Sequence, residues 1–229
     1  MLIYESGKTC GTIGGGKFEA LVIQDCLATI QDKTPVLKIY PLHEHDVESF
    51  GAICGGEVTV LMEPYAKSEA IFLVGGGHCA LAIARLANEC GMHVTVVDDR
   101  ASLLDNFPDT VDATSDVNPP DFISGRKWEP DEALVLVSRN YEIDRDALAA
   151  ALKNPGAGYV GMIGSSRKIR RVFDELKSQG FSSEELERVY SPVGLDIGAD
   201  SPAEIAVSVI AEIMKVQRRR SGGHLRSTK

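Results

Sequence analysis

The residues that most strongly suggest chemistry form a glycine-rich turn at residues 75–77, between an apolar run that predicts a buried strand and a predicted helix. Glycine lets the backbone approach a phosphate closely, and the start of a helix offers free N–H groups to an anion. The next apolar run, residues 93–97, ends at Asp98, which could accept a ribose hydroxyl. This order predicts a nucleotide-binding fold, and it says more about the fold than about the ligand.

A second glycine turn, at Gly164, follows another apolar run that predicts a buried strand. Ser165 or Ser166 is expected to cap the helix that comes next. Arg167 and Lys168 then fall in its first turn, where a cation opposes the helix dipole. Such cations favour a bound anion, although an ordinary strand-to-helix turn with a solvated basic pair explains the sequence equally well.

The third glycine turn, Gly14-Gly15-Gly16, lies near the start of the sequence and is followed by Lys17. It could hold a phosphate, with the lysine as counter-charge. Phe18, however, stands where the phosphate-binding loop of ATPases carries the hydroxyl that holds Mg²⁺. We therefore do not interpret it as an ATPase site, and a flexible exit from a hairpin is the alternative.

Cys54-Gly55-Gly56 is a candidate thiol site. Two glycines after a cysteine expose the thiol and free the neighbouring N–H groups, which favours the thiolate. The alternative is a small buried hydrophobic residue, which is the commoner role of a free cysteine. Cys79 lies inside the first glycine turn and Cys90 in the helix after it, and both are expected to be packing residues.

Residues 43–46, His-Glu-His-Asp, offer four metal ligands, but structural zinc sites often pair such ligands with cysteines, so an acidic solvated loop is the preferred interpretation. His78, Arg139 and Asn140 lie at predicted strand ends and could face a ligand. No Ser-His-Asp arrangement, catalytic carboxylate pair or His-Glu-x-x-His motif occurs. The sequence therefore indicates binding more clearly than a reaction.

The elements that would position these residues fall into two groups. The first group of elements, which precedes residue 64, predicts a small α+β unit, and residues 64–68 form the expected linker. In residues 70–214, strands and helices alternate, which predicts a parallel sheet covered by helices on both faces. Asp144 is a plausible N-cap, and Ser201 and Glu204 form a capping box. The predicted strands are 2–4, 9–13, 36–40, 57–62, 71–74, 93–97, 133–137 and 159–163, and the predicted helices are 18–30, 81–89, 145–152, 167–177 and one starting at 202.

Composition narrows the function classes. The 229 residues carry a formal charge of −9, which argues against nucleic acid as a partner, because binding it needs clustered Lys and Arg. No apolar stretch approaches a membrane-spanning length, and no signal peptide is visible. Five cysteines are an odd number, which suits free thiols in a reducing cytoplasm. Residues 218–229 are expected to form a flexible basic tail.

Six blocks of residues follow one another in an order that is more specific than any single turn. They are 11–16 with Glu19, 54–56 ahead of 63–64, 75–78, 97–100, 159–165, and 194–199 followed by 202–206. Together these blocks resemble the XdhC/CoxI family, the accessory factors that mature molybdenum-containing hydroxylases such as xanthine dehydrogenase.

The resemblance implies an α/β protein with an N-terminal XdhC/CoxI-type α+β domain at residues 1–66 and a C-terminal Rossmann-like domain at 67–217. It implies a non-catalytic factor that binds molybdenum cofactor, protects it and helps deliver the sulfurated form to an apo-hydroxylase. Members are expected to form dimers and to meet a cysteine desulfurase.

The sequence departs from the family pattern in three places. The expected leading helix and Gly-Ser-rich turn do not precede the first predicted strand. Lys17 stands where a CoxI-like branch carries cysteine, which leaves Cys54 as the motif thiol. Asn140-Tyr141 replaces an Asn-His pair.

The leading hypothesis is a maturation chaperone that binds molybdenum cofactor. The alternatives are an NAD(P)-dependent oxidoreductase, supported by the first turn and Asp98, and a non-catalytic nucleotide-sensing or scaffold subunit. Cys54 is the candidate thiol ligand or sulfur relay. The expected cofactor-binding residues are Gly14, Gly15, Gly16, Lys17, Glu19, Gly55, Gly56, Gly75, Gly77, His78, Asp98, Arg100, Gly164, Ser165 and Arg167.

Overall fold

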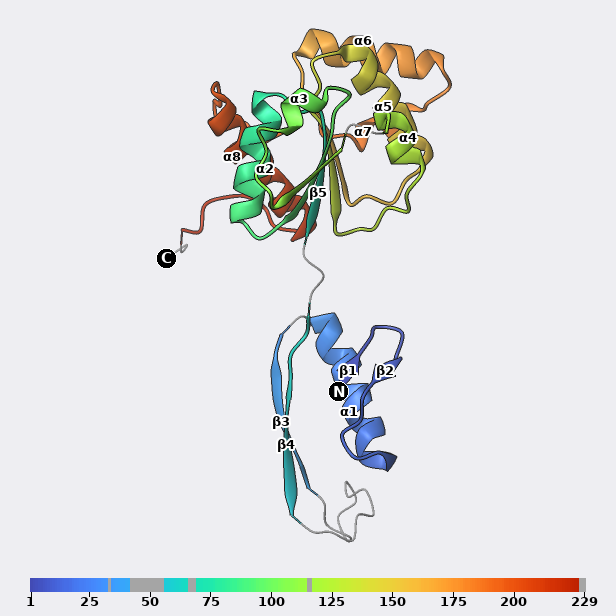
Figure 1. Ribbon diagram of the computed structural model, residues 1–229, viewed down its shortest axis with the longest axis vertical. Coiled ribbons are helices and arrows are strands. Elements are labelled where there is room, and N and C mark those ends of the chain that lie inside the picture. Colours follow the sequence, from blue (N-terminus) through green and yellow to red (C-terminus); the bar gives the residue numbers. More distant parts are fainter. Residues whose placement is uncertain (33, 42–55, 66–68, 115–116, 227–229) are drawn as a thin grey trace. The chain divides into compact units, whose positions relative to one another are not determined.

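The computed structural model describes residues 1–32, 34–41, 56–65, 69–114 and 117–226. The chain divides into two compact units, Met1–Lys67 and Ser68–Lys229, and each is described by itself (Figure 1).

The second unit is built on a five-stranded, wholly parallel sheet. Its strand order is β7-β6-β5-β8-β9, and Ala70 pairs with His93 on one side and with Glu132 on the other. The central strand β5 and its neighbour β8 are buried at every position, as expected of a sheet covered on both faces. The strands are β5 Ala70–Val74, β6 His93–Val97, β7 Val111–Thr114, β8 Glu132–Leu136 and β9 Tyr159–Met162.

Two layers of helices cover the sheet, one on each face (Figure 1). On one face, helices α2 (His78–Glu89) and α8 (Pro202–Gln217) pack against strand residues such as Ile71 and Val135. On the other face, Phe72, Leu134 and Met162 contact a second group of helices. That group is α4 (Pro119–Ser124), α5 (Tyr141–Lys153), α6 (Ser166–Ser178) and α7 (Ser183–Glu187), and the short α3 is Ala101–Leu104. The predicted Rossmann-like fold is confirmed.

Several element boundaries differ from the sequence prediction, including the predicted strand 9–13, which is only Thr9–Cys10, and the starts of two helices differ most. Helix α2 begins three residues earlier than predicted, at His78. Helix α5 begins at Tyr141, because the side chain of Asn140 accepts a hydrogen bond from the Glu142 N–H. The prediction that Asp144 caps α5 is therefore wrong, since this residue lies within the helix and is fully buried.

The short elements β7, α3, α4 and α7 were not predicted, since four to six residues carry little periodicity. The capping box of Ser201 and Glu204 is present at the start of α8. At its other end, Arg218 forms an ion pair with Glu69, with 3.1 Å between the Nη2 and Oε2 atoms. Within the described residues, no helix is both long and apolar enough to cross a membrane.

The described residues of the first unit form one helix and two hairpins. Strands β1 (Leu2–Ile3) and β2 (Thr9–Cys10) pair antiparallel, as do β3 (Val36–Pro41) and β4 (Glu57–Met62). Helix α1 (Gly16–Asp32) contacts one face of the second hairpin, where the Phe18 and Tyr40 rings meet edge to face at 5.5 Å. The opposite face of this hairpin exposes Leu37, Ile39 and Leu61.

Candidate functional site

The carboxyl ends of β5, β6, β8 and β9 bring four loops, which the structure describes in full, to one edge of the sheet. The chain leaves β5 for β6 through α2, and it later returns to the other side of β5 as β8. In open α/β sheets, ligands bind where the strand order reverses in this way. The loops that follow these four strands are residues 75–77, 98–100, 137–140 and 163–165, and the loops after β5 and β8 flank the reversal point.

The first glycine turn is held tightly between the neighbouring strands. Gly75 has φ +116°, and a Cβ at this position would lie 2.8 Å from the Val137 carbonyl oxygen and 2.9 Å from Ser138 backbone atoms. The Gly75 N–H also donates to the Val97 carbonyl, at 2.8 Å. A residue without a side chain is therefore required here, to let the turn pass between β6 and β8.

The start of α2 is open to an incoming group. The helix begins after Gly77, and among the described residues no side chain caps it. A Cβ built at Gly77 would meet none of the described atoms within 4 Å. By contrast, Asn140, Ser165 and Ser201 cap α5, α6 and α8 with their side chains. The first N–H groups of α2 are thus available to an anion.

Asp98 closes the other side of the turn. Its buried carboxylate accepts four hydrogen bonds, from the Gly76 N–H at 2.6 Å, the Arg100 N–H at 2.9 Å, and Arg100 Nε and Nη2 at 2.8 Å each. A carboxylate has about four lone-pair sites, so these donors saturate it. The predicted contact with a ribose would require a hydroxyl to displace one of them.

The electrostatics of Asp98 follow from these bonds. Burial alone would raise the pKa of the carboxyl group, but the hydrogen bonds from Arg100 and from the Gly76 N–H outweigh burial and lower the pKa to about 2. The carboxylate is therefore charged at neutral pH, and it fixes both Gly76 and Arg100 in place.

The turn after β9 holds an internal ion pair that the sequence did not reveal. Lys168 Nζ contacts the carboxylate of Asp144 and also donates to the Ile163 carbonyl, at 3.2 Å. Asp144 in turn accepts a hydrogen bond from the Ser138 N–H, at 3.2 Å. Burial raises the pKa of Asp144, although Lys168 opposes the shift. Lys168 is therefore half-buried and engaged within the chain rather than free for an external anion, whereas Arg167 is exposed.

The glycine turn of the first unit is closed by its own carboxylate. Glu19 Oε2 accepts hydrogen bonds from the Thr12 hydroxyl, from the Ile13 N–H at 3.0 Å and from the Gly15 N–H at 3.1 Å. These bonds, the one from Thr12 first, lower the pKa of Glu19. Donors that could have bound a phosphate are thus engaged within the turn. Gly14, Gly15 and Gly16 all have positive φ, and Lys17 is exposed.

Comparison with known protein families agrees with this architecture. The family model of the XdhC Rossmann domain matches residues 71–213, and the model of the XdhC and CoxI family matches residues 1–41. The chain belongs to the XdhC and CoxI family. The first match begins within β5 and ends within α8, so it includes these four loops.

Two curated relatives show the same kinship. The chain is 31% identical over 225 residues to the uncharacterized protein YqeB of Escherichia coli (strain K12). This alignment covers 97% of this chain and 41% of the relative. It is also 31% identical over 151 residues to a probable xanthine dehydrogenase subunit of Bacillus subtilis (strain 168). That alignment covers 65% of this chain and 43% of the relative. The chain therefore spans about two fifths of the length of these relatives.

A solved structure shares the fold. A crystal structure described as a xanthine dehydrogenase from Bacillus halodurans superimposes with a TM-score of 0.59 at 20% sequence identity, covering 96% of this chain and 86% of the other. At that identity the similarity concerns the fold alone.

Several predicted site residues of this XdhC chain lie apart from the edge of the sheet, or outside the described residues. Cys54, Gly55 and the segment 43–46 fall outside the described residues. Gly56 precedes β4, in the first unit. In the described part of the chain, no group of three or more His, Cys, Asp or Glu side chains could hold a metal ion.

The two cysteines predicted to pack differ from each other. Cys79 is half-buried, and burial raises the pKa of its thiol. Cys90 is exposed, so the prediction that it packs in the interior is wrong. It follows Glu89 at the end of α2, and both residues are exposed.

A second buried carboxylate escaped the sequence analysis. Glu212 lies on the buried side of α8 and accepts hydrogen bonds from the Tyr159 hydroxyl at 2.5 Å and from the Gly194 N–H at 2.9 Å. Burial, together with this bond to Glu212, raises the pKa of Tyr159. The pair anchors the loop after Tyr190 to the sheet. Its sequence signal is an acidic residue within the apolar face that contains Val209 and Ile213.

Proposed function

We propose that this chain is an accessory factor of a xanthine dehydrogenase-type molybdenum hydroxylase, and that it binds the molybdenum cofactor and delivers it to that enzyme. Family membership supports the first part, as does the relative in B. subtilis, which is named as part of a probable xanthine dehydrogenase. The open first turn of α2 is the structural observation on which the second part rests.

The residues at the edge of the sheet fit the phosphate of such a cofactor, which is a phosphorylated pterin with a sulfur-rich metal end. The N–H groups after Gly77 would hold the phosphate, because the helix start is uncapped within the described residues and the space beside Gly77 is open. His78 and Arg139 are exposed at the ends of β5 and β8, the two strands that flank the reversal point. Arg139 would supply the counter-charge.

The metal end of the cofactor requires a soft ligand. Thiolates suit a molybdenum–sulfur centre, so Cys54 is the residue that we propose as ligand or sulfur relay. When bound, the cofactor supplies the redox chemistry of the client hydroxylase, whereas this chain would bind, orient and shield it. A cysteine desulfurase and a second copy of this chain are the other partners that we propose.

The proposal is tested by measuring molybdenum and pterin in protein purified from a host that makes the cofactor. We expect both in the wild-type protein, and a loss of molybdenum in Cys54→Ala. Cys90→Ala is the matched control, because this thiol is exposed and lies at the end of α2, away from the edge of the sheet. Absence of pterin from the wild-type protein would refute cofactor binding, and unchanged molybdenum in Cys54→Ala would remove that thiol from the mechanism.

A second candidate function is that of an NAD(P)-dependent oxidoreductase, which the uncapped start of α2 and the glycine turn also favour. The saturated carboxylate of Asp98 weakens this candidate, because a ribose would have to compete with Arg100. Titration with NADH, followed by nicotinamide fluorescence, separates the two functions. Tight binding with substrate-dependent oxidation would favour the oxidoreductase, and binding without oxidation would favour a nucleotide-sensing or scaffold role.

A further inference from the structure

The ion pair of Asp144 and Lys168 joins two loops at the carboxyl edge of the sheet. Lys168 Nζ contacts the Asp144 carboxylate and donates to the Ile163 carbonyl oxygen, in the loop after β9, at 3.2 Å. The Asp144 carboxylate also accepts a hydrogen bond from the Ser138 N–H, in the loop after β8, at 3.2 Å. Asp144 is fully buried, and the Lys168 side chain is 21% exposed. One pair of opposite charges therefore fixes backbone groups of both loops.

Through Ser138, the ion pair also supports the glycine turn after β5. A Cβ at Gly75 would lie 2.9 Å from the Ser138 N and Cα atoms, so this backbone is pressed against the turn that precedes α2. The Ser138 hydroxyl donates to the Asn140 carbonyl oxygen at 2.8 Å and accepts from the Asn140 N–H at 3.2 Å. The exposed Arg139 lies between these two residues. Asp144 therefore holds the segment that carries Arg139 against the glycine turn.

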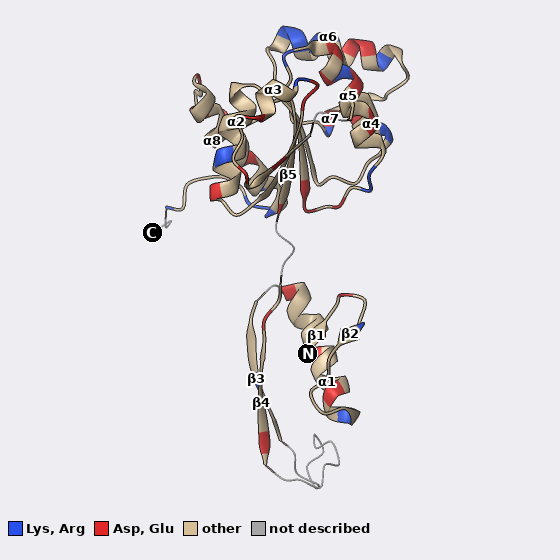
Figure 2. Ribbon diagram, in the orientation of Figure 1, with Lys and Arg blue, Asp and Glu red and all other residues tan. Residues whose placement is uncertain are grey.

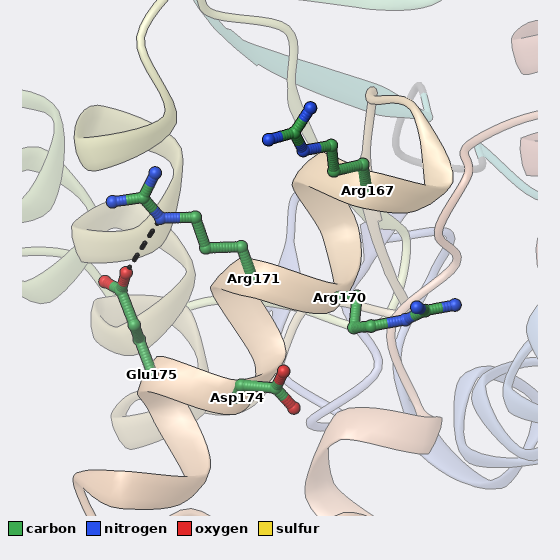
Figure 3. A pocket seen from close by; sticks show the side chains of 5 residues that line it. All are labelled: Arg167, Arg170, Arg171, Asp174 and Glu175. Atoms are coloured by element: carbon green, nitrogen blue, oxygen red, sulfur yellow. Dashed lines mark hydrogen bonds and ion pairs between the residues drawn. The ribbon is translucent and has the colours of Figure 1, made fainter.

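The outer surface of α6, the helix that carries Lys168, has charges of a different kind. Basic and acidic residues alternate along this helix (Figure 2). Arg171 forms an ion pair with Glu175 at 3.2 Å, and Arg167 and Arg170 point to different sides of the helix (Figure 3). All three arginines are exposed, so water can solvate their charges. Lys168 differs from them, because most of its side chain leaves water for a buried partner.

Stability alone gives little reason for this buried pair. Burying two charges costs hydration energy, which their attraction recovers only in part. Burial raises the pKa of Asp144, although the hydrogen bond and the charge of Lys168 oppose the shift. Replacing a buried ion pair with apolar residues of similar volume is often neutral or stabilising. What an apolar pair could not do is hold the Ser138 N–H and the Ile163 carbonyl in fixed directions.

We propose that Asp144 and Lys168 are positioning residues for the anion that binds at the start of α2. They fix the loops after β8 and β9 before a ligand binds, and they keep Arg139 beside the strand that leads into α2. This role rests on the proposed function, which supplies the anion, and extends it to two residues that are engaged within the chain. A ligand then meets loops whose conformational entropy was already lost during folding.

The decisive variant removes the ion pair without leaving a buried charge. Asp144→Leu/Lys168→Met, the pair variant, replaces both members with apolar side chains, so the midpoint of urea unfolding followed by circular dichroism should not fall. Hydrogen exchange at residues 138–140 and 163–165 should become at least about tenfold faster, because these loops lose their anchor. Exchange in β5 and β8 should stay as in the wild-type chain.

A second buried ion pair, at the opposite edge of the sheet, provides the matched control. Glu132 is buried and accepts hydrogen bonds from Arg126 Nη2 at 2.8 Å and from the Glu129 N–H at 3.0 Å. It begins β8, whereas the loop that contains Ser138 follows the end of this strand. Arg126→Met/Glu132→Leu therefore removes the same charges and should leave exchange in both loops unchanged.

Pterin content of protein purified from a host that makes the cofactor reports whether the ordered loops serve binding. We expect at least about fivefold less pterin in the pair variant than in the wild-type chain and in the control variant. A pair that served stability alone would not change the pterin content of a stable variant. Unchanged exchange in the loops, unchanged pterin in the pair variant, or an equal loss in the control variant would overturn the proposal.

Failure of the proposed function gives a different result. Wild-type protein without pterin refutes cofactor binding, and NADH then becomes the probe. Weaker binding of NADH by the pair variant alone keeps the positioning role, whereas a wild-type chain that binds neither pterin nor NADH overturns both proposals. If the pair variant does not fold, Lys168→Met is compared with Arg126→Met, and the same results support or overturn the role.

Discussion

The glycine turns of the two units look alike in sequence but differ in what they leave open. In the first unit, Glu19 takes two N–H groups of the turn and the hydroxyl of Thr12. In the second unit, Asp98 takes the Gly76 N–H, and the start of α2 after Gly77 has no side-chain cap in the described part of the chain. A glycine-rich turn therefore predicts a backbone shape, whereas its capacity for an anion depends on whether a carboxylate of the chain already occupies it.

The largest expected effect concerns how tightly each turn is packed. Gly75→Ala should lower the free energy of unfolding of the second unit by about 4 kcal/mol, because its Cβ would meet backbone atoms at a strained φ. Gly15→Ala in the first unit should cost only about 1 kcal/mol, since its Cβ would meet no described atom within 4 Å.

Fluorescence can follow the second unit alone, because Trp128 is the single tryptophan of the chain and is buried. Urea unfolding monitored at Trp128 would measure Gly75→Ala, with Gly77→Ala as a control that should change little. Hydrogen exchange in α1 would measure Gly15→Ala. Similar losses for Gly75→Ala and Gly77→Ala would contradict the tight passage between the strands.

The next effect concerns the two carboxylates. Asp98→Asn should destabilise the second unit by about 3 kcal/mol, since it removes the charge from a buried pair and leaves donors of Arg100 without an acceptor. Glu19→Gln should cost clearly less, because the turn that it closes is exposed to water. Urea unfolding of the Asp98 variant and hydrogen exchange of the Glu19 variant test the difference, which equal losses would refute.

The pH dependence of stability should report on the Asp98 site. Asp98 has a pKa of about 2 in the folded chain against 3.8 for a free side chain, so the unfolded chain binds more protons between these values. Its contribution, of order 2 kcal/mol, is complete above about pH 4 and is lost as the pH falls toward 2. Unfolding of the wild-type chain and of Asp98→Asn, compared at neutral pH and at about pH 3, measures it. A constant difference between the two proteins would contradict the assignment.

The smallest effect on stability is also the sharpest test of the comparison. Gly77→Asp would give α2 a side-chain cap and place a carboxylate at its start, as Glu19 does for the turn of the first unit. We expect a gain of a few tenths of a kcal/mol, together with loss of bound pterin cofactor. Thermal unfolding and pterin content report the two results. Retained pterin would show that the start of α2 is not the anion site.

Local pattern was enough to predict much of the architecture. The apolar runs at β5, β6, β8 and β9 indicated the parallel sheet, and Ser201 with Glu204 marked the start of α8. Hydrophobic periodicity and capping chemistry depend on neighbours in sequence, so they are visible without the fold.

The chemistry at the edge of the sheet was harder to predict, because its contacts join distant residues. Lys168 and Asp144 lie 24 positions apart, and Gly76 and Asp98 lie 22 positions apart. The sequence marked Lys168 as a cation for an external anion, and Asp144 as a cap, because each was judged by its own helix. Only the pairing of β8 with β9 brings the two side chains together.

The network of Asp98 has a consequence for the speed of recognition. Gly76 and Arg100 are fixed before any ligand binds, so the conformational entropy of ordering this turn is lost during folding and not on binding. A ligand reaching the first turn of α2 meets a preorganised backbone, and capture there needs no closing loop. Its association rate should therefore be set by diffusion and charge, not by rearrangement of the protein.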